Sequence, residues 1–107
     1  MNESQLRKGA LELIIVGLLS RTPTYGGDLL ERLSDEAHLD ISPGTVYPLL
    51  ARLHKTGTLA THWEESPTGP PRKIYSVTTA GRHHHTDLLA EWDHLDAAIR
   101  ATSPRKD

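Results

Sequence analysis

The segment 42–55 combines a helical pattern of apolar residues with a polar face suited to binding a polyanion. Its apolar residues lie at the spacing that forms one face of a helix, and they are Val46, Leu49, Leu50 and Leu53. The opposite face carries a hydroxyl, an aromatic ring with a polar tip, a small rigid ring and two cations, from Thr45, Tyr47, Pro48, Arg52 and Lys55. Because this face has no carboxylate, it can approach the phosphates of a nucleic acid without repulsion.

The ends and the composition of this segment indicate a helix shaped by a partner. Ser42 is a suitable N-cap, and Pro43 suits the first helical position, where its missing N–H costs nothing. Gly57 is expected to end the helix as its C-terminal cap. Gly44 and Pro48 are poor helix formers, so we interpret them as selected for close approach of the backbone to a partner rather than for stability.

The histidines offer a second kind of chemistry, which is metal binding. His83, His84 and His85 are adjacent, so on a helix they point in different directions and cannot all bind one metal ion. The candidates that would have to join one of them after folding are His54, His62 and His94. A metal-responsive protein is kept as an alternative, but no metal site is predicted, and the histidines could instead add positive charge as the pH falls toward about 6.5.

No arrangement typical of an enzyme is visible. The serines Ser34, Ser42 and Ser66 lie at predicted caps or turns, and neither a Gly-x-Ser-x-Gly motif nor a phosphate-binding loop occurs. We therefore expect no catalytic residues and no cofactor.

Length and composition indicate one small domain. The chain has 107 residues and a formal net charge of -2, and it contains no cysteine. Its longest apolar run, 11–19, is interrupted by Glu12 and is too short to span a bilayer, so we expect a cytoplasmic protein without a membrane partner. The segment 42–86 is locally basic between the acidic segments 28–40 and 87–96, which fits one DNA-binding face and equally fits ordinary solvated surface.

The elements around these residues predict a mainly α fold with a small β-hairpin. Helices are expected at 5–20, at about 25–37 after Thr24 as the cap, at 42–55, and from Thr79 as the cap to about residue 99. Strands are expected at 59–65 and 73–78, joined by the Pro- and Gly-rich turn 66–71. A helix-turn-helix followed by a hairpin is a winged helix, in which Arg72 and Lys73 would lie along the DNA backbone.

The first and last helices carry more apolar surface than one small domain needs. In the last helix the apolar residues are spaced by four, three and four positions, the heptad seam of a two-helix contact, and they are Leu88, Trp92, Leu95 and Ile99. The first helix has a wide apolar stripe that either reaches a second subunit or simply forms the core. We therefore divide the chain into a winged-helix DNA-binding domain (1–80), a C-terminal dimerisation helix (81–101) and a flexible tail (102–107).

Three blocks of the sequence match a known pattern. They are the Tyr-Gly-Gly-Asp-Leu entry to the second helix (25–29) after Leu18-Leu19, the Ile-Ser-Pro-Gly-Thr-Val-Tyr-Pro-Leu-Leu-Ala-Arg-Leu segment (41–53), and the Gly-Pro-Pro-Arg-Lys-Ile-Tyr-Ser-Val-Thr-Thr-Ala-Gly segment (69–81). Together they resemble the PadR family of bacterial transcriptional regulators, in which they form the helix entry, the recognition helix, and the wing with the start of the last helix. The single short C-terminal helix is similar to that of the family's smaller subgroup.

The resemblance implies a homodimer that binds double-stranded DNA, usually as a repressor relieved by a ligand, and we expect a pseudo-palindromic operator. By position, Thr45 and Tyr47 would meet the DNA in the major groove. The other candidate contacts are Tyr25 and Ser42 near phosphates, Pro48 and Arg52 on the helix face, and Arg72 and Lys73 on the wing. The alternative is a winged-helix protein-interaction module that does not bind DNA.

Trp92 has two interpretations. On a heptad seam it would face its own copy in the partner, or the first helix, as an aromatic of the dimer core. Alternatively, two Trp92 rings would line a cavity for a planar aromatic effector, as in some members of the family that this chain resembles. The candidate interface and effector residues are Ile15, Leu88, Leu89, Trp92, Leu95 and Ile99.

Overall fold

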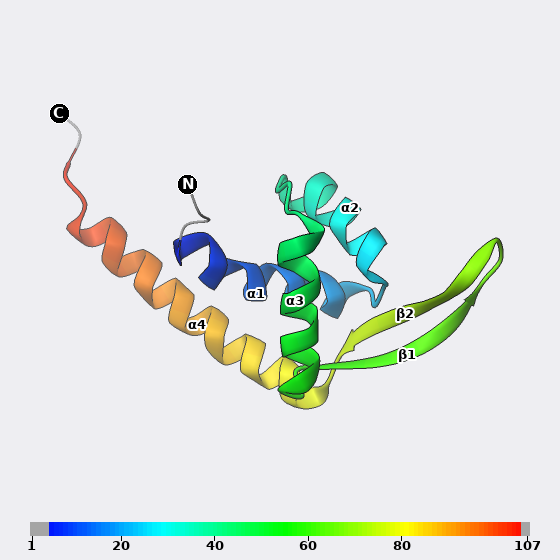
Figure 1. Ribbon diagram of the computed structural model, residues 1–107. Helices are drawn as coiled ribbons and strands as arrows, with labels where there is room; N and C mark the ends of the chain where they lie inside the picture. Colours follow the sequence, from blue (N-terminus) through cyan, green and yellow to red (C-terminus); the bar gives the residue numbers. More distant parts are fainter. Residues whose placement is uncertain (1–4, 106–107) are drawn as a thin grey trace.

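The computed structural model describes residues 5–105, in which helices and one antiparallel hairpin alternate as the sequence predicts. In chain order the elements are α1 (Gln5–Arg21), α2 (Gly26–Ala37), α3 (Pro43–Lys55), β1 (Leu59–Ser66), β2 (Gly69–Val77) and α4 (Thr79–Thr102). The helices α1, α2 and α3 form a central body, and the hairpin and α4 extend from it on opposite sides (Figure 1). The molecule is therefore elongated, with principal extents of 58 × 30 × 22 Å.

The hydrophobic core lies around α1, the helix that α3 crosses in Figure 1. From α1 it takes Leu11, Ile15, Val16, Leu18 and Leu19, from α2 and the following loop Leu29, Leu33 and Ile41, from α3 Val46, Leu50 and Leu53, and from the hairpin Leu59, Tyr75 and Val77. The apolar stripes read from the sequence for the first three helices therefore meet in one cluster, as the hydrophobic effect requires of amphipathic helices in a small domain. Within residues 5–105, no helix is both long enough and apolar enough to cross a bilayer.

The hairpin is joined to the body by a short bridge at its base. Thr24, in the connection between α1 and α2, exchanges two backbone hydrogen bonds with Tyr75 of β2, at 3.3 and 2.8 Å. Beyond this bridge, β1 and β2 pair from Leu59↔Val77 to Glu64↔Arg72, and a register shift follows before Ser66. The strands thus extend away from the body as a two-stranded wing whose base alone is buried.

Two of the predicted helix caps do not form. The second helix begins at Gly26 after Tyr25, one residue later than predicted, and the Thr24 hydroxyl donates to the Asp28 carboxylate at 2.7 Å instead of capping the backbone. Ser42 does precede α3, but its side chain makes no capping hydrogen bond; its hydroxyl lies 3.2 Å from that of Thr45. Both hydroxyls have a side-chain partner within four residues, and this partner replaces the backbone N–H.

The cap of the last helix is Thr78 rather than the predicted Thr79. The Thr78 hydroxyl accepts a hydrogen bond from the Gly81 N–H at 2.9 Å and donates to the Gly57 carbonyl at 2.6 Å. Gly81 itself lies so close to the α3–β1 connection that a Cβ there would overlap the Thr58 carbonyl oxygen. These contacts fix the direction in which α4 leaves the body.

Several element ends differ from the predicted ones. The first helix extends to Arg21, β2 already begins at Gly69 inside the predicted turn, and α4 continues to Thr102. Residue 102 is thus helical, so the predicted tail loses its first residue, and the part of that tail at 106–107 lies outside the described residues. Gly57 follows the α3 cap residue Thr56 and has a φ of 84°, the left-handed conformation that the predicted helix end requires.

Candidate nucleic-acid interface

The outer face of α3 presents the side chains that the sequence assigns to a nucleic acid. Val46, Leu50 and Leu53 are buried, whereas Tyr47 is 45% exposed, and Pro48 and Lys55 are also exposed. Ser42 is exposed and Thr45 half-buried at the start of the helix, with their hydroxyls in contact. The amphipathic pattern therefore holds α3 by one side and leaves an uncharged or cationic side facing outward.

Tyr47 is positioned by a glycine at the start of α2. A Cβ placed on Gly26 would overlap Cε1 of Tyr47 and lie 2.6 Å from its hydroxyl oxygen, so the ring rests directly against the Gly26 backbone. The sequence left open whether this glycine served a neighbour, a phosphate or a loose helix end, and the structure shows that it admits a tyrosine ring. Burial first, and then the electrostatic effect of Tyr47, raise the pKa of Tyr75 above its ordinary value of 10.0.

The two wing cations lie on opposite faces of the hairpin. Side chains alternate along a strand, so Lys73 shares its face with the core residue Tyr75, and Arg72 lies on the other face. Arg72 stacks over the Tyr25 ring with its Cζ 4.4 Å from the ring centroid. The sequence treated Arg72 and Lys73 as one cationic pair, whereas the fold places the two side chains on opposite faces of the hairpin.

Trp63 is a candidate contact that the sequence pattern did not single out. It is directly opposite Lys73 in the hairpin, and the Lys73 ammonium lies 5.7 Å from the centroid of its ring. The Trp63 side chain is nevertheless 67% exposed. The strand register places this indole opposite Lys73, on the face of the hairpin that also carries Tyr75. The patterns of the two separate strands do not contain this register.

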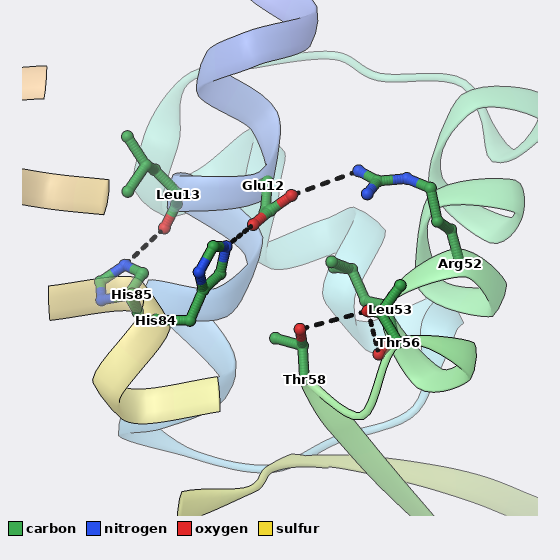
Figure 2. Close-up of polar contacts among 8 residues, drawn as sticks. All are labelled: Glu12, Leu13, Arg52, Leu53, Thr56, Thr58, His84 and His85. Carbon is green, nitrogen blue, oxygen red and sulfur yellow. Dashed lines mark hydrogen bonds and ion pairs between the residues drawn. The ribbon is translucent and has the colours of Figure 1, made fainter. Parts of the chain in front are cut away.

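Arg52 does not stand free on the α3 face as expected. Its Nη2 lies 3.2 Å from Oε1 of Glu12 on α1, although the arginine side chain remains 57% exposed (Figure 2). The sequence placed Arg52 among the cations that face the polyanion, and Glu12 had no assigned partner. The ion pair forms because α3 crosses α1 at this level.

A second concave surface lies between α1 and α4. This groove of about 450 Å³ is lined by Leu13, Ile14 and Gly17 from α1 and by His85, Leu89 and Trp92 from α4. The prediction that Ile15 belongs to this surface is wrong, because its side chain is 0% exposed in the core, and Ile14 takes its place. Leu95 and Ile99 lie further along α4 and are 50% and 59% exposed, while Leu88 is half-buried.

The adjacent histidines of α4 have separate surroundings. The His85 ring nitrogen donates to the Leu13 carbonyl at 3.0 Å, and Nε2 of His84 lies 3.2 Å from Oε2 of Glu12 (Figure 2). His83 is exposed. Among residues 5–105, no three histidine, aspartate or glutamate side chains are grouped so that they could hold a metal ion.

Comparison with known proteins agrees with this arrangement. Residues 15–87 match the model of the Transcriptional regulator PadR-like family. The transcriptional regulator Rv3488 of Mycobacterium tuberculosis is 32% identical over 78 residues, which cover 73% of this chain and 71% of that protein.

Solved structures extend the similarity to almost the whole chain. A PadR-like transcription factor from Bacteroides fragilis is 40% identical, covers 92% of this chain and 95% of its own, and superposes with a TM-score of 0.80. A PadR family transcriptional regulator from Eggerthella lenta is 33% identical, with coverages of 91% and 84% and a TM-score of 0.83. The predicted winged helix is thereby confirmed, and the chain belongs to the PadR-like family of DNA-binding transcriptional regulators.

Proposed function

We propose that the protein acts as a homodimer that represses transcription from a pseudo-palindromic operator and is released by a planar aromatic ligand. The observation that carries this proposal is the apolar side of α4. Leu95 and Ile99 are 50% and 59% exposed, although they continue the helical seam that begins at Leu88, and Leu89 beside this seam is 43% exposed. Of all residues in α4, only Gly81 is buried. A second copy of α4 would cover this seam with the spacing of a two-helix contact.

The proposed operator follows from the position of the two α3 helices in such a dimer. Each copy would place the face around Tyr47 in a major groove, and the two copies would need half-sites one helical turn, ~34 Å, apart. Lys73 and Trp63, which are paired across the hairpin, would lie against the adjoining phosphates and sugars. Association through α4 sets the separation of these two surfaces, so a change at α4 would alter DNA affinity.

The groove beside Trp92 supports the ligand part of the proposal. Its walls include the Trp92 indole, His85 and the aliphatic side chains of Leu13, Ile14, Leu18 and Leu89, and the charged Arg21 and Glu36 also line it. A flat aromatic molecule would stack on the indole and exclude water from the aliphatic walls. Because α4 forms one wall, a ligand there would shift the helix that joins the two copies.

The dimer is tested by sedimentation of a seam variant. Leu95→Glu places a carboxylate on the proposed seam, and we expect the dimer to dissociate at concentrations where the unmodified protein stays paired. Ala97→Glu is the matched control, because Ala97 is exposed on the same helix, two positions away from the seam residues Leu95 and Ile99. A Leu95→Glu protein that sediments like the Ala97→Glu protein would contradict the proposed interface.

DNA binding is tested by anisotropy on sites selected from genomic fragments. Tyr47→Ala is expected to lose a contact to charged phosphate worth about 1.5–3 kcal/mol, or about tenfold or more in affinity. Lys73→Ala is expected to reduce the slope of affinity against salt by about 0.9. If neither variant differs from the unmodified protein, α3 and the wing do not form the contact surface proposed here.

The ligand is tested by fluorescence in a Trp63→Phe background, in which Trp92 is the remaining indole. Planar aromatic compounds that quench this emission should also release the operator. A broad library that leaves the emission unchanged would refute the effector part and leave the DNA-binding part standing.

A further inference from the structure

Glu12 joins three helices through one carboxylate. It lies on α1 and its side chain is 17% exposed. Its Oε1 accepts from Nη2 of Arg52 on α3, and its Oε2 contacts Nε2 of His84 on α4, both at 3.2 Å. Figure 2 shows the carboxylate between the guanidinium on one side and the imidazole on the other. The recognition helix and the proposed dimerisation helix are thus both attached to the same acid.

Arg52 sits at the border between this acid and the outer face of α3. Besides its contact with Glu12, it lines a shallow depression together with Thr45 and Pro48, two residues of the face assigned to DNA. The Arg52 side chain is 57% exposed, so rotation about its side-chain bonds can move the guanidinium away from Glu12. An exposed ion pair of this kind is weak, and a DNA phosphate can compete for the arginine.

We propose that Glu12 withholds Arg52 from DNA, and that protonation of His84 weakens this restraint and raises DNA affinity. The inference rests on the proposed DNA contact of α3. A charged imidazole beside Oε2 offsets the negative charge that holds the guanidinium at Oε1. Glu12 therefore limits the affinity of the protein for its operator, and His84 makes that limit dependent on pH.

Among residues 5–105, few titratable groups face His84. Glu12 faces it from α1, and Arg52 comes from α3 to the same cleft. The α3–β1 connection contributes Thr56 and Thr58 to this cleft, and neither side chain titrates. On α4 itself the adjacent residues are His83 and His85, and His85 is bonded to the Leu13 carbonyl. Asp87, three positions after His84, lies on the same side of the helix and is the carboxylate of α4 nearest to it in sequence.

The first test is operator affinity of Glu12→Gln, a change that keeps the shape of the side chain and removes its charge. We expect affinity to rise about two- to fivefold, the range set by a weak ion pair, and the salt slope to steepen by about 0.9, because one more cation meets a phosphate. A merely structural Glu12 would give the opposite sign, since loosening α3 lowers affinity. An unchanged or weaker affinity with intact helical circular dichroism overturns the proposal.

A double-mutant cycle assigns the effect to Arg52. On an Arg52→Gln background, Glu12→Gln should leave both affinity and salt slope unchanged, because no cation remains to be released. A gain that persists on this background would come from general removal of negative charge, and it overturns the proposal. If the unmodified protein binds no DNA at all, the proposed function fails instead, so the two failures are distinguishable.

The second test does not require Glu12 variants to fold. Operator affinity is measured from about pH 8 to about pH 5.5, the interval in which histidine side chains gain a proton. His84→Gln should flatten the rise at low pH, whereas His83→Gln, the exposed neighbour on the same helix, should keep it. Equal pH profiles for the two variants would overturn the role of His84.

Discussion

Helices α1 and α4 both carry an apolar stripe in the sequence, but the stripe of α1 is buried in the structure and that of α4 is largely exposed. In α1 the stripe is buried inside the chain, through Leu11, Leu13, Ile15, Val16, Leu18 and Leu19. In α4, whose residues are all described, Gly81 alone is buried. The first helix is covered by α2, α3 and the base of the wing, whereas the second half of α4 extends away from the body (Figure 1). An apolar stripe thus indicates a contact without saying whether the partner lies in the same chain.

The buried stripe of α1 and the exposed seam of α4 also have different roles. The body around α1 supplies the buried area that stabilises the fold, and it holds α3 and the wing in place. The exposed seam of α4 contributes little to a single copy and is available to a partner. Residues of the body should therefore govern unfolding at any concentration, and residues of the seam should govern it only where copies associate.

The largest expected effect is the loss of stability caused by a substitution in the core of the body. Leu50→Ala removes a side chain that is 0% exposed, and we expect the free energy of unfolding to fall by about 2–5 kcal/mol. Leu95→Ala is the matched change on the seam, where the side chain is 50% exposed. Urea unfolding at two protein concentrations measures both: the Leu50 effect should be independent of concentration and the Leu95 effect dependent on it. If the two substitutions changed stability with the same dependence on protein concentration, the distinction between the body and the α4 seam would be wrong.

The next effect concerns the junction between the regions. A Cβ on Gly81 would overlap the Thr58 carbonyl oxygen and lie 3.0 Å from Cγ1 of Val77, so Gly81→Ala forces α4 away from the body. We expect a loss of about 1–3 kcal/mol, as for other overpacked sites.

Gly9→Ala in α1 is the control for the junction variant. Apart from the local backbone and the flanking residues, no atom of residues 5–105 lies within 4 Å of the position that its Cβ would take. Alanine should therefore stabilise the helix by about 0.5–1 kcal/mol. Thermal unfolding compares the two, and a stabilised Gly81→Ala protein would show that the junction is not tight.

A smaller effect is expected where the body positions Tyr47, the tyrosine that we propose contacts DNA. A Cβ on Gly26 would overlap the Tyr47 ring, and the ring can move because it lies at the end of a side chain. Gly26→Ala should therefore cost about 1 kcal/mol of operator affinity, one hydrogen bond, with little change in unfolding. Gly9→Ala is again the control, because its Cβ would meet neither Tyr47 nor Tyr25.

The smallest expected effect is a loss of stability at high pH, caused by the core residue Tyr75. The pKa of Tyr75 is raised above 10.0 by burial and by Tyr47, so the folded state holds this proton more tightly than the unfolded chain does. The corresponding stability is fully present below about pH 10 and is lost as the pH rises through the folded-state pKa. Urea unfolding across this interval should show a shallower decline for Tyr75→Phe than for the unmodified protein, and identical slopes would contradict the assignment.

Local signals predicted the kinds of elements well and their ends less well. The helix periodicity of 42–55 and the Pro- and Gly-rich turn between two strand-like runs led to the winged helix that the structure and its relatives confirm. The caps were less predictable because a hydroxyl near the start of a helix can bond to several side-chain or backbone groups. Thr24 is bonded to Asp28, and Thr78 is bonded to Gly57, 21 positions earlier in the sequence.

In the candidate site, too, local features were predictable from the sequence and contacts between distant residues were not. The sequence was sufficient to place Tyr47 on the outer face of its helix and Arg72 and Lys73 on a wing, because periods of 3.6 and 2.0 residues fix which side chains share a face. It could not pair Arg52 with Glu12, 40 positions away, or His84 with Glu12, 72 positions away.

The sequence by itself determined the helices, the hairpin and the polar face of α3, since each depends on residues close together along the chain. Only the tertiary structure decided that Ile15 is core, that Trp63 lies opposite Lys73, and that one carboxylate holds both α3 and α4. These outcomes depend on how helices cross and how strands register, and such contacts join residues whose separation along the chain carries no periodic signal.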